Sequence, residues 1–209
     1  MYLDVFDRNP YGTDCWLLAA DGTDQAVVVD PGFEPEAVHA LLDAAGKTPA
    51  AVLLTHAHLD HAGTAGVFAG DGIPVFCHPA DALAFTDPVA WRRDGFPNPL
   101  EPVKDLRSVE DGDVLRLAGV DVEVWHTPGH TPGHCIFRVD GDVLVFSGDL
   151  VFAGSVGRSD FANSDPEQMR RSLERFLTLP DELRVLPGHG PVTTVGHERA
   201  TNPYLRELA

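Results

Sequence analysis

A histidine-rich segment at residues 55–61, THAHLDH, directly follows the apolar run AAVLL. Such a run is typical of a buried strand, so we expect the histidines to emerge at a strand end. His56 and His58 are two residues apart and would point to the same side of an extended backbone. Asp60 and His61 follow after the chain has begun to turn and can face a second point. Four metal-competent side chains in two pairs suggest two adjacent cations.

Further possible ligands follow other predicted strands. The segment HTPGHTPGH at residues 126–134 follows a clear apolar strand, and its Pro-Gly pairs favour sharp turns. Two more apolar runs end in Gly148-Asp149 and in Gly188-His189. Glycine before a ligand lets the backbone approach a metal without a clash from Cβ. The sequence therefore predicts one site whose ligands come from several separated loops.

The predicted elements favour an α/β fold. We expect strands at residues 2–7, 15–20, 25–30, 51–54, 73–77, 113–117, 120–125, 135–139, 143–146 and 184–186. We expect helices at residues 35–45, 62–69, 166–179 (capped by Asp165 or Ser164) and 197–208, and a hairpin turn at 21–24. Residues 87–109 show little periodicity and are interpreted as a long loop or lid near the site. Strands followed by helices in both halves suit two packed sheets with helices on both outer sides.

Composition narrows the functional classes. A net charge of -17 over 209 residues argues against nucleic acid or an anionic membrane as a partner. The cysteines Cys15, Cys77 and Cys135 lie in apolar runs and fit neither a disulfide framework nor a cysteine-rich zinc site, so we expect them in the core. No secretory signal is visible, and no apolar run approaches the ~20 residues of a membrane span. We expect one domain over residues 1–209, cytoplasmic, acting on a small molecule.

In this combination of motifs the chain resembles hydrolases of the metallo-β-lactamase fold, and specifically the glyoxalase II branch (hydroxyacylglutathione hydrolases and their short, single-domain relatives). The matching segments occur in the family's order, at residues 55–61, 127–134, 147–152, 154–161 and 187–193. The resemblance implies a four-layer αββα sandwich with two mixed sheets.

The resemblance also implies seven metal ligands in three roles: a first set (His56, His58, His130), a second set (Asp60, His61, His189) and a bridging carboxylate (Asp149). Imidazole and carboxylate ligands suit two divalent ions, with zinc as the expected metal and iron or manganese as alternatives. Seven ligands over two ions leave coordination positions open, as a catalytic site requires.

The implied reaction is hydrolysis of a thioester, such as an S-2-hydroxyacylglutathione, by hydroxide held between the two metals. A thiolate leaving group is weakly basic, so no strong general acid is needed. Asp60 is a candidate proton acceptor in this reaction. Arg158, in the stretch GRSDF, could face the substrate or form an internal ion pair with Asp160.

The remaining histidines have simpler interpretations. We expect His126 and His134, which flank His130, to support the site rather than to bind metal. His78, before a proline, is interpreted as a turn or pocket residue. His39 and His197 fall on predicted helices and are expected to be solvated.

The pattern departs from full-length glyoxalase II in three ways. Only residues 190–209 follow His189, so no separate C-terminal helical glutathione-binding domain is expected. Gly190-Pro191-Val192 replaces a segment that often carries a glutathione-contacting tyrosine, and basic residues for the glutathione carboxylates are scarce. Metal-centred hydrolysis is therefore better supported than a glutathione thioester as the substrate.

Other functions remain open from the sequence. A persulfide dioxygenase would hold one iron through His58 or His56, His130 and Asp149. Hydrolysis of a lactone, another ester or a β-lactam on the same dinuclear centre is a second alternative. A non-catalytic metal-binding module is a third, although a structural role needs fewer ligands. The sequence makes no prediction of oligomeric state.

Overall fold

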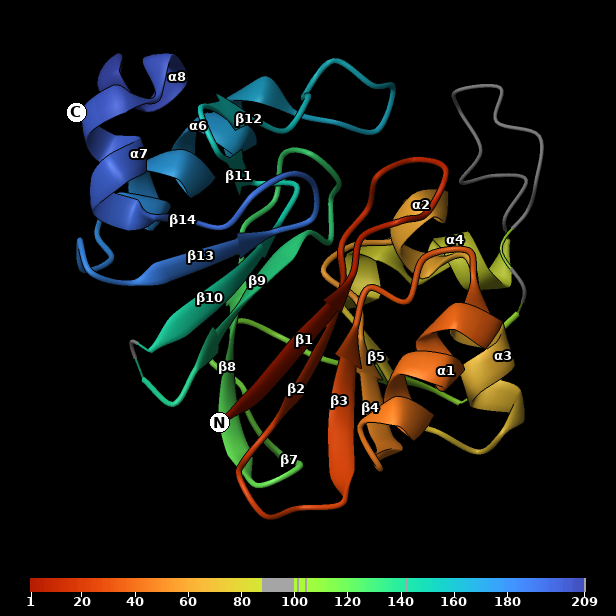
Figure 1. Cartoon of the computed structure of the whole chain (residues 1–209). Helices are drawn as coiled ribbons and strands as arrows, with labels where there is room; N and C mark the ends of the chain where they lie inside the picture. Colours follow the sequence, from red (N-terminus) through yellow and green to blue (C-terminus); the bar gives the residue numbers. More distant parts are fainter. Residues whose placement is uncertain (88–99, 101, 104, 142, 209) are drawn as a thin grey trace.

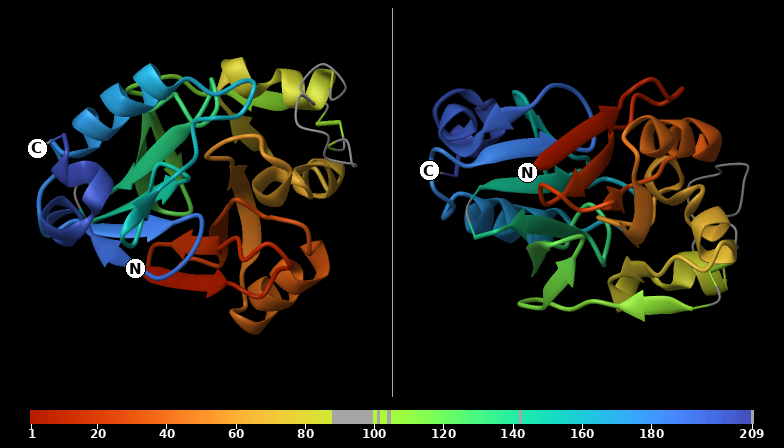
Figure 2. Two further views of the ribbon diagram at one scale, coloured as in Figure 1. Left: turned by 90° about the horizontal axis from the view of Figure 1, so that it is seen from above. Right: turned by 60° about the horizontal axis from the view of Figure 1, so that its bottom comes forward.

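The computed structural model describes residues 1–87, 100, 102–103, 105–141 and 143–208 (Figure 1). Two six-stranded mixed sheets form the centre of the molecule. Helices cover the outer side of each sheet, as the views from above and below show (Figure 2). The predicted α/β sandwich with two packed mixed sheets is confirmed.

The first sheet has the strand order β1-β2-β3-β4-β5-β6. Its strands are β1 (Tyr2–Phe6), β2 (Cys15–Ala19), β3 (Gln25–Val29), β4 (Thr48–Leu53), β5 (Val75–Cys77) and β6 (Leu106–Ser108). The pairs β1–β2 and β2–β3 are antiparallel, and the predicted turn at residues 21–24 connects β2 to β3. The pairs β3–β4, β4–β5 and β5–β6 are parallel, and parallel neighbours need a crossover connection instead of a hairpin.

The second sheet has the order β14-β13-β10-β9-β8-β7. Its strands are β7 (Val114–Leu117), β8 (Val120–His126), β9 (Cys135–Val139), β10 (Leu144–Gly148), β13 (Arg184–Pro187) and β14 (Thr193–Thr194). Only the pair β10–β13 is parallel among its described strands. A small hairpin of β11 (Val151–Phe152) and β12 (Ser155–Val156) follows β10.

The helices are short. They are α1 (Pro35–Ala44), α2 (Leu59–Ala62), α3 (Ala65–Gly70), the 3₁₀ turn η1 (Pro79–Asp81), α4 (Leu83–Thr86), α6 (Pro166–Phe176), α7 (Val195–Thr201) and α8 (Pro203–Arg206). The carboxylate of Asp165 accepts hydrogen bonds from the backbone N–H groups of Glu167 and Gln168, which identifies Asp165 as the cap of α6.

Two apolar cores hold these layers together. The larger core joins both sheets and includes Leu17, Val52 and Phe137, all fully buried. The smaller core lies under the C-terminal helices, where Phe176 of α6 and Leu205 of α8 are fully buried. The three cysteines are free and buried, as expected. Among the described residues, no helix has the length and hydrophobicity needed to cross a membrane.

Several element boundaries differ from the sequence predictions. The helix expected at 62–69 is two short helices, α2 and α3. The helix expected at 197–208 begins at Val195 and is interrupted at Asn202, whose extended backbone precedes Pro203, because a residue before proline disfavours the helical conformation. The helix α6 ends at Phe176 rather than 179. The strands β11, β12 and β14 are two residues each and were not predicted.

The interpretation of residues 87–109 as one irregular loop was wrong at its end. Leu106–Ser108 pairs in parallel with β5 and forms the edge strand β6 of the first sheet. Three residues are too few to show the periodicity of a strand. This strand forms because its backbone pairs with β5, not because of its own sequence pattern. Most of the remaining segment, and with it the suggested lid, lies outside the described residues.

Candidate metal centre

The histidine-rich segment changes backbone conformation in its middle. His58 is extended and is the N-cap residue of α2, whereas Asp60 and His61 lie within that helix. The chain therefore turns between the two pairs of side chains, as expected. The segment lies at the carboxyl end of β4, where loops after parallel strands meet.

The three later ligand candidates also follow strands. His130 lies in the loop between β8 and β9, Asp149 directly follows β10, and His189 follows β13. Because β10 and β13 are parallel neighbours, Asp149 and His189 leave the second sheet at the same edge.

All seven predicted ligands lie together. In the described part of the chain, three groups have one ligand atom per residue within 4.8 Å of one another: His56 with His58 and His130, Asp60 with His61 and His189, and His56 with His61 and Asp149. The first two groups match the two sets implied by the sequence. That these residues bind metal stays a prediction.

The first group brings three imidazole nitrogens to one point. Nδ1 of His58 lies 3.0 Å from Nε2 of His56 and 2.9 Å from Nε2 of His130. Nδ1 of His130 lies 2.7 Å from the carbonyl oxygen of Arg158 and donates to it. A neutral imidazole that donates through Nδ1 has its lone pair on Nε2, so His130 presents a ligand atom to the cluster.

The second group combines two imidazoles with a carboxylate. Oδ2 of Asp60 lies 3.3 Å from Nε2 of His189 and 3.5 Å from Nε2 of His61. Nδ1 of His189 is 3.1 Å from the carbonyl oxygen of Gly12, and Nδ1 of His61 is 2.9 Å from Oδ2 of Asp30. Both rings are thereby oriented with Nε2 toward the cluster.

Asp149 lies between the two groups. Its Oδ2 is 3.4 Å from Nε2 of His130, and its Oδ1 is 3.2 Å from Nε2 of His61. Oδ1 is buried and has no hydrogen-bond partner among the described residues. A buried carboxylate oxygen without a partner is costly, and a cation would satisfy it.

The protonation equilibria of the first group favour ligand formation. Burial and the neighbouring His130 ring together lower the pKa of His58 to about 3. Burial also lowers the pKa of His56 well below its ordinary value. These imidazoles therefore carry free lone pairs at neutral pH. Burial alone would raise the pKa of Asp149, but His61 and His130 hold it below the ordinary range, so the carboxylate stays ionised. Neutral imidazoles and ionised carboxylates are the donor set of Zn²⁺ and of iron.

In the second group burial would lower the pKa of His61 and of His189, but the carboxylates of Asp60 and Asp149 raise it above the ordinary value. A cation would therefore have to displace those protons.

Two glycines leave space for the ligands. A Cβ at Gly188 would lie 2.6 Å from Cε1 of His61 and 2.7 Å from Oδ1 of Asp149. Gly148 has φ +47°, and a Cβ there would lie 2.6 Å from the side chain of Thr55. The residue before each of Asp149 and His189 must therefore lack a side chain, as the strand-end pattern suggested.

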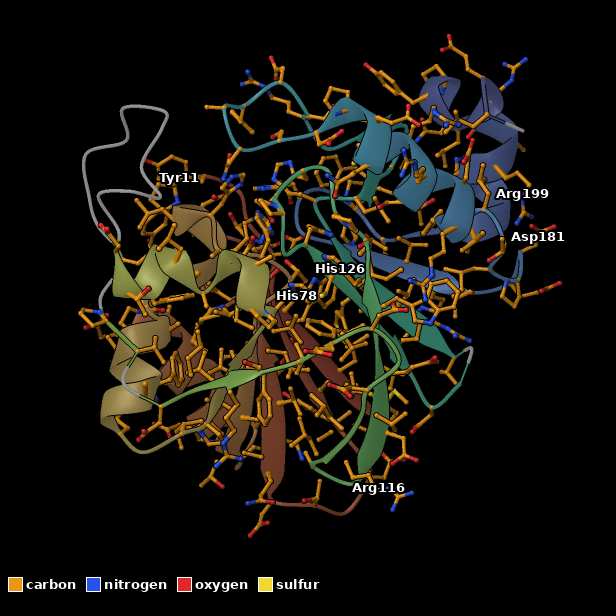
Figure 3. The ribbon with its side chains drawn as sticks, turned by 180° about the vertical axis from the view of Figure 1, so that it is seen from behind. Tyr11, His78, Arg116, His126, Asp181 and Arg199 are labelled. Carbon is orange, nitrogen blue, oxygen red and sulfur yellow. The ribbon has the colours of Figure 1, made fainter. Side chains whose placement is uncertain are left out.

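The flanking histidines have structural contacts. Nε2 of His134 accepts from the backbone N–H of Asp149 at 3.1 Å, and its Nδ1 lies 3.0 Å from the hydroxyl of Thr127. Nε2 of His126 lies 2.9 Å from the carbonyl oxygen of Pro132. The ring of His126 stacks on that of His78 at 3.9 Å, on the face seen from behind (Figure 3).

The other two histidines lie on helices. His39 of α1 stacks on Phe68 and faces Asp71 at 3.9 Å. His197 lies in α7 and is exposed, as expected.

Arg158 forms the ion pair that was one of its two interpretations. Its guanidinium group donates to both carboxylate oxygens of Asp160 at 2.8 and 3.0 Å and lies 4.4 Å above the ring of Phe161. Phe161 in turn packs edge-on against His58 and His130. The arginine is therefore beside the site, and a role in substrate binding stays a prediction.

Sequence reasoning missed several residues that support the ligands. Asp30 contacts His61, and the hydroxyl of Thr13 donates to Oδ2 of Asp60 at 3.0 Å. A pattern could have indicated Asp30, since it too follows an apolar strand and precedes a Pro-Gly turn. Nothing local marks Thr13, which reaches Asp60 only through the packing of the first loop.

Comparisons with known proteins agree with this geometry. The sequence profile described as Metallo-beta-lactamase superfamily matches residues 8–189. Hydroxyacylglutathione hydrolase GloC from Haemophilus influenzae is 32% identical over 98% of each chain.

Two solved structures are also similar. The B3 metallo-beta-lactamase BLEG-1 superposes with a TM-score of 0.88 at 33% identity, covering 98% of this chain and 99% of that one. TTHA1623, in a di-iron-bound form, superposes with a TM-score of 0.83 at 43% identity, covering 97% and 100%.

Proposed function

This chain belongs to the metallo-beta-lactamase superfamily, and from that premise we propose that it is a metallo-hydrolase that cleaves a thioester, such as an S-2-hydroxyacylglutathione, at a centre of two divalent cations. The observation that carries the proposal is the position of Asp149, whose two carboxylate oxygens face different groups of ligands. A single cation would need only one of these groups.

The proposed ligand roles follow the two groups. His56, His58 and His130 would hold one cation, Asp60, His61 and His189 the other, and Asp149 both. When bound, the two cations supply Lewis acidity that lowers the pKa of water and polarises a carbonyl group.

The chain's own side chains prepare the site for a substrate. The ring of Phe161 packs 5.4 Å from that of His58, and the ring of Phe152 packs 5.7 Å from that of His189. These half-buried rings border the two ligand groups and limit the access of bulk water. They suit an acyl group with apolar character.

Asp60 serves best as a ligand in this proposal. Burial would raise its pKa, but His61 and the hydrogen bond with His189 hold the pKa of Asp60 below its ordinary range. Such a carboxylate is a weak base, which favours binding a cation over accepting a proton. The role of Asp60 as a proton acceptor therefore stays a prediction, with ligation as its primary role.

Zinc is the proposed metal, and iron is the alternative. The imidazole and carboxylate donors suit both ions. The similar structure in a di-iron-bound form supports two metal positions and makes iron the first alternative to test.

The choice of a thioester as the proposed substrate rests on similarity to a hydroxyacylglutathione hydrolase. Arg158 is the proposed contact for a substrate carboxylate, which would take the place of Asp160 at the exposed guanidinium group. Because an exposed ion pair contributes only about 0–1 kcal/mol, its exchange would cost little.

The test combines metal analysis with three assays on one preparation. Two metal ions per chain and hydrolysis of S-lactoylglutathione, or of a thioester without glutathione, would support the proposal. Parallel assays measure β-lactam cleavage and O₂ uptake with glutathione persulfide. One iron per chain with O₂ consumption and no hydrolysis would contradict it and favour the dioxygenase alternative.

A further inference from the structure

The carboxylate of Asp81 joins two of the ligand-bearing segments. Asp81 ends η1 and is fully buried. Its Oδ2 accepts from the backbone N–H of Ala57 at 3.0 Å and from the hydroxyl of Thr131 at 2.7 Å. Its Oδ1 accepts from the backbone N–H of Gly133 at 2.6 Å. Asp81 belongs to neither ligand-bearing segment, yet its carboxylate connects the two.

The donors of these hydrogen bonds lie beside the first group of ligands. Ala57 separates His56 from His58, and Thr131 directly follows His130. The same three histidines have ring nitrogens that meet within hydrogen-bonding distance. Asp81 is therefore placed to set the distance between the first pair of histidines and the third.

The fit between Asp81 and the second segment is close. A Cβ on Gly133 would lie 2.7 Å from both Cγ and Oδ1 of Asp81. Only glycine lets this backbone come near enough for its N–H to reach the carboxylate. The loop carrying His130 is therefore shaped around the Asp81 side chain.

Burial of this carboxylate has a cost that apolar packing would avoid. Burial raises the pKa of Asp81 to about 6, although the three hydrogen bonds oppose the shift. A buried carboxylate is tolerated when its hydrogen bonds are made, and removal of a partner then costs more than the net value of the bond.

We propose that Asp81 is a positioning residue for the metal centre: by binding Ala57, Thr131 and Gly133 together, it holds His56, His58 and His130 at the separation that one cation requires. The proposal rests on the proposed function, because it assumes that these histidines bind metal. Asp81 itself is not a ligand, since it acts through the backbone of the two segments.

The decisive variant is Asp81→Asn, which keeps the shape of the side chain. The amide nitrogen cannot accept, so at least one of the Ala57 and Gly133 N–H groups would face a donor instead of an acceptor. If two Co²⁺ ions bind in two steps, we expect the affinity of the more strongly affected step to fall about tenfold or more. Other groups that orient metal ligands have effects of this size. The Co²⁺ absorption spectrum should change as well, because it reports the ligand geometry directly.

Glu198 provides a matched control. It is also fully buried, and it accepts three hydrogen bonds, from the N–H of Gly154 at 2.8 Å, the hydroxyl of Thr193 at 2.6 Å and the amide of Asn202 at 2.9 Å. None of these donors lies next to a proposed ligand. Glu198→Gln should lower the unfolding midpoint in the same way but leave Co²⁺ affinity within about twofold of the wild type.

A gentler pair of variants covers the case in which Asp81→Asn does not fold. Thr131→Val removes one donor to Asp81 and should weaken Co²⁺ binding in the same direction, whereas Thr131→Ser keeps the hydroxyl and should restore it. Unchanged affinity and spectrum in Asp81→Asn, or in Thr131→Val when Asp81→Asn does not fold, would overturn the positioning role. Equal weakening in Glu198→Gln would also overturn it. Wild-type protein that binds no Co²⁺ would overturn both this inference and the proposed function.

Discussion

Nδ1 of His61 lies 2.9 Å from Oδ2 of Asp30, and both side chains are buried. Oδ1 of Asp30 also accepts from the backbone N–H of Thr55, and Oδ2 accepts from the Thr55 hydroxyl. One carboxylate from the end of β3 therefore orients a ring of the second ligand group and holds the start of the histidine-rich segment. The ring is left with Nε2 directed at Asp149 and His189.

Replacement of Asp30 by Asn should weaken metal binding without removing a ligand. The Asn amide would present a donor either to His61 or to the N–H of Thr55, so the ring loses its defined orientation. We expect about 10–100-fold weaker binding of one of two Zn²⁺ ions, measured by titration against a competing chelator.

Asp71→Asn is the control for this change, because Asp71 is exposed, faces His39 at 3.9 Å and belongs to none of the three ligand groups. The Asp71→Asn variant should bind Zn²⁺ with the same affinity as the wild type. Identical titration curves for Asp30→Asn and wild type would show that the contact does not orient the ring.

Removal of the Asp149 carboxylate should affect both metal positions. Its two oxygens lie 3.4 Å from His130 and 3.2 Å from His61, so Asp149→Ala takes a donor from each group. We expect loss of metal loading and of hydrolytic activity, measured by elemental analysis and thioester assay. His39→Ala, in which the altered side chain lies on α1, should leave both intact; full activity in Asp149→Ala would refute the bridging role.

The sequence allowed the ligand set to be anticipated because the ligands are local features. His56, His58, Asp60 and His61 lie within one segment, and Asp149 and His189 each follow a glycine at the end of an apolar strand. The sheets were anticipated for the same reason, since their central strands carry either apolar runs, as in β2 and β10, or apolar residues at every second position, as in β8.

The contacts that orient the ligands could not be anticipated in this way. Asp81 reaches Thr131 and Gly133 across about fifty positions of sequence, and Thr13 reaches Asp60 across 47. Nothing in the local pattern of η1 indicates which loop will pack above it. Short edge strands such as Leu106–Ser108 escaped notice for a related reason, because neighbouring backbone defines them.

Substitution of Gly188 tests whether the approach of backbone to the ligands matters. Gly188→Ala would place Cβ 2.6 Å from Cε1 of His61 and 2.7 Å from Oδ1 of Asp149, so one of these groups must move. We expect a loss of about 1–3 kcal/mol in unfolding free energy, together with reduced metal content.

Gly70→Ala is the matched control. Gly70 is the last residue of α3, and a Cβ there would meet nothing within 4 Å. We expect a change within about 1 kcal/mol, toward greater stability, with unchanged metal content. Equal metal content in the two variants would contradict the steric argument for Gly188.

The stacked pair His78 and His126 should make stability depend on pH outside the metal centre. Burial and the His126 ring at 3.9 Å together lower the pKa of His78 to about 4, while Asp111 acts in the opposite direction. In the unfolded chain the ring would titrate near its ordinary value of about 6.5. As pH falls from about 6.5 to about 4, the unfolded state takes up a proton that the folded state does not, so stability is lost across that window.

In the wild type, Nδ1 of His78 accepts a hydrogen bond from the backbone N–H of Ala80 at 3.2 Å. His78→Asn removes the titrating ring and keeps an acceptor for this N–H. We expect its unfolding free energy in urea to fall less than that of the wild type between about pH 7 and about pH 5. His197→Asn, at an exposed position of α7, should follow the wild-type pH dependence. If His78→Asn followed it too, protonation of the His78 ring would not be coupled to unfolding.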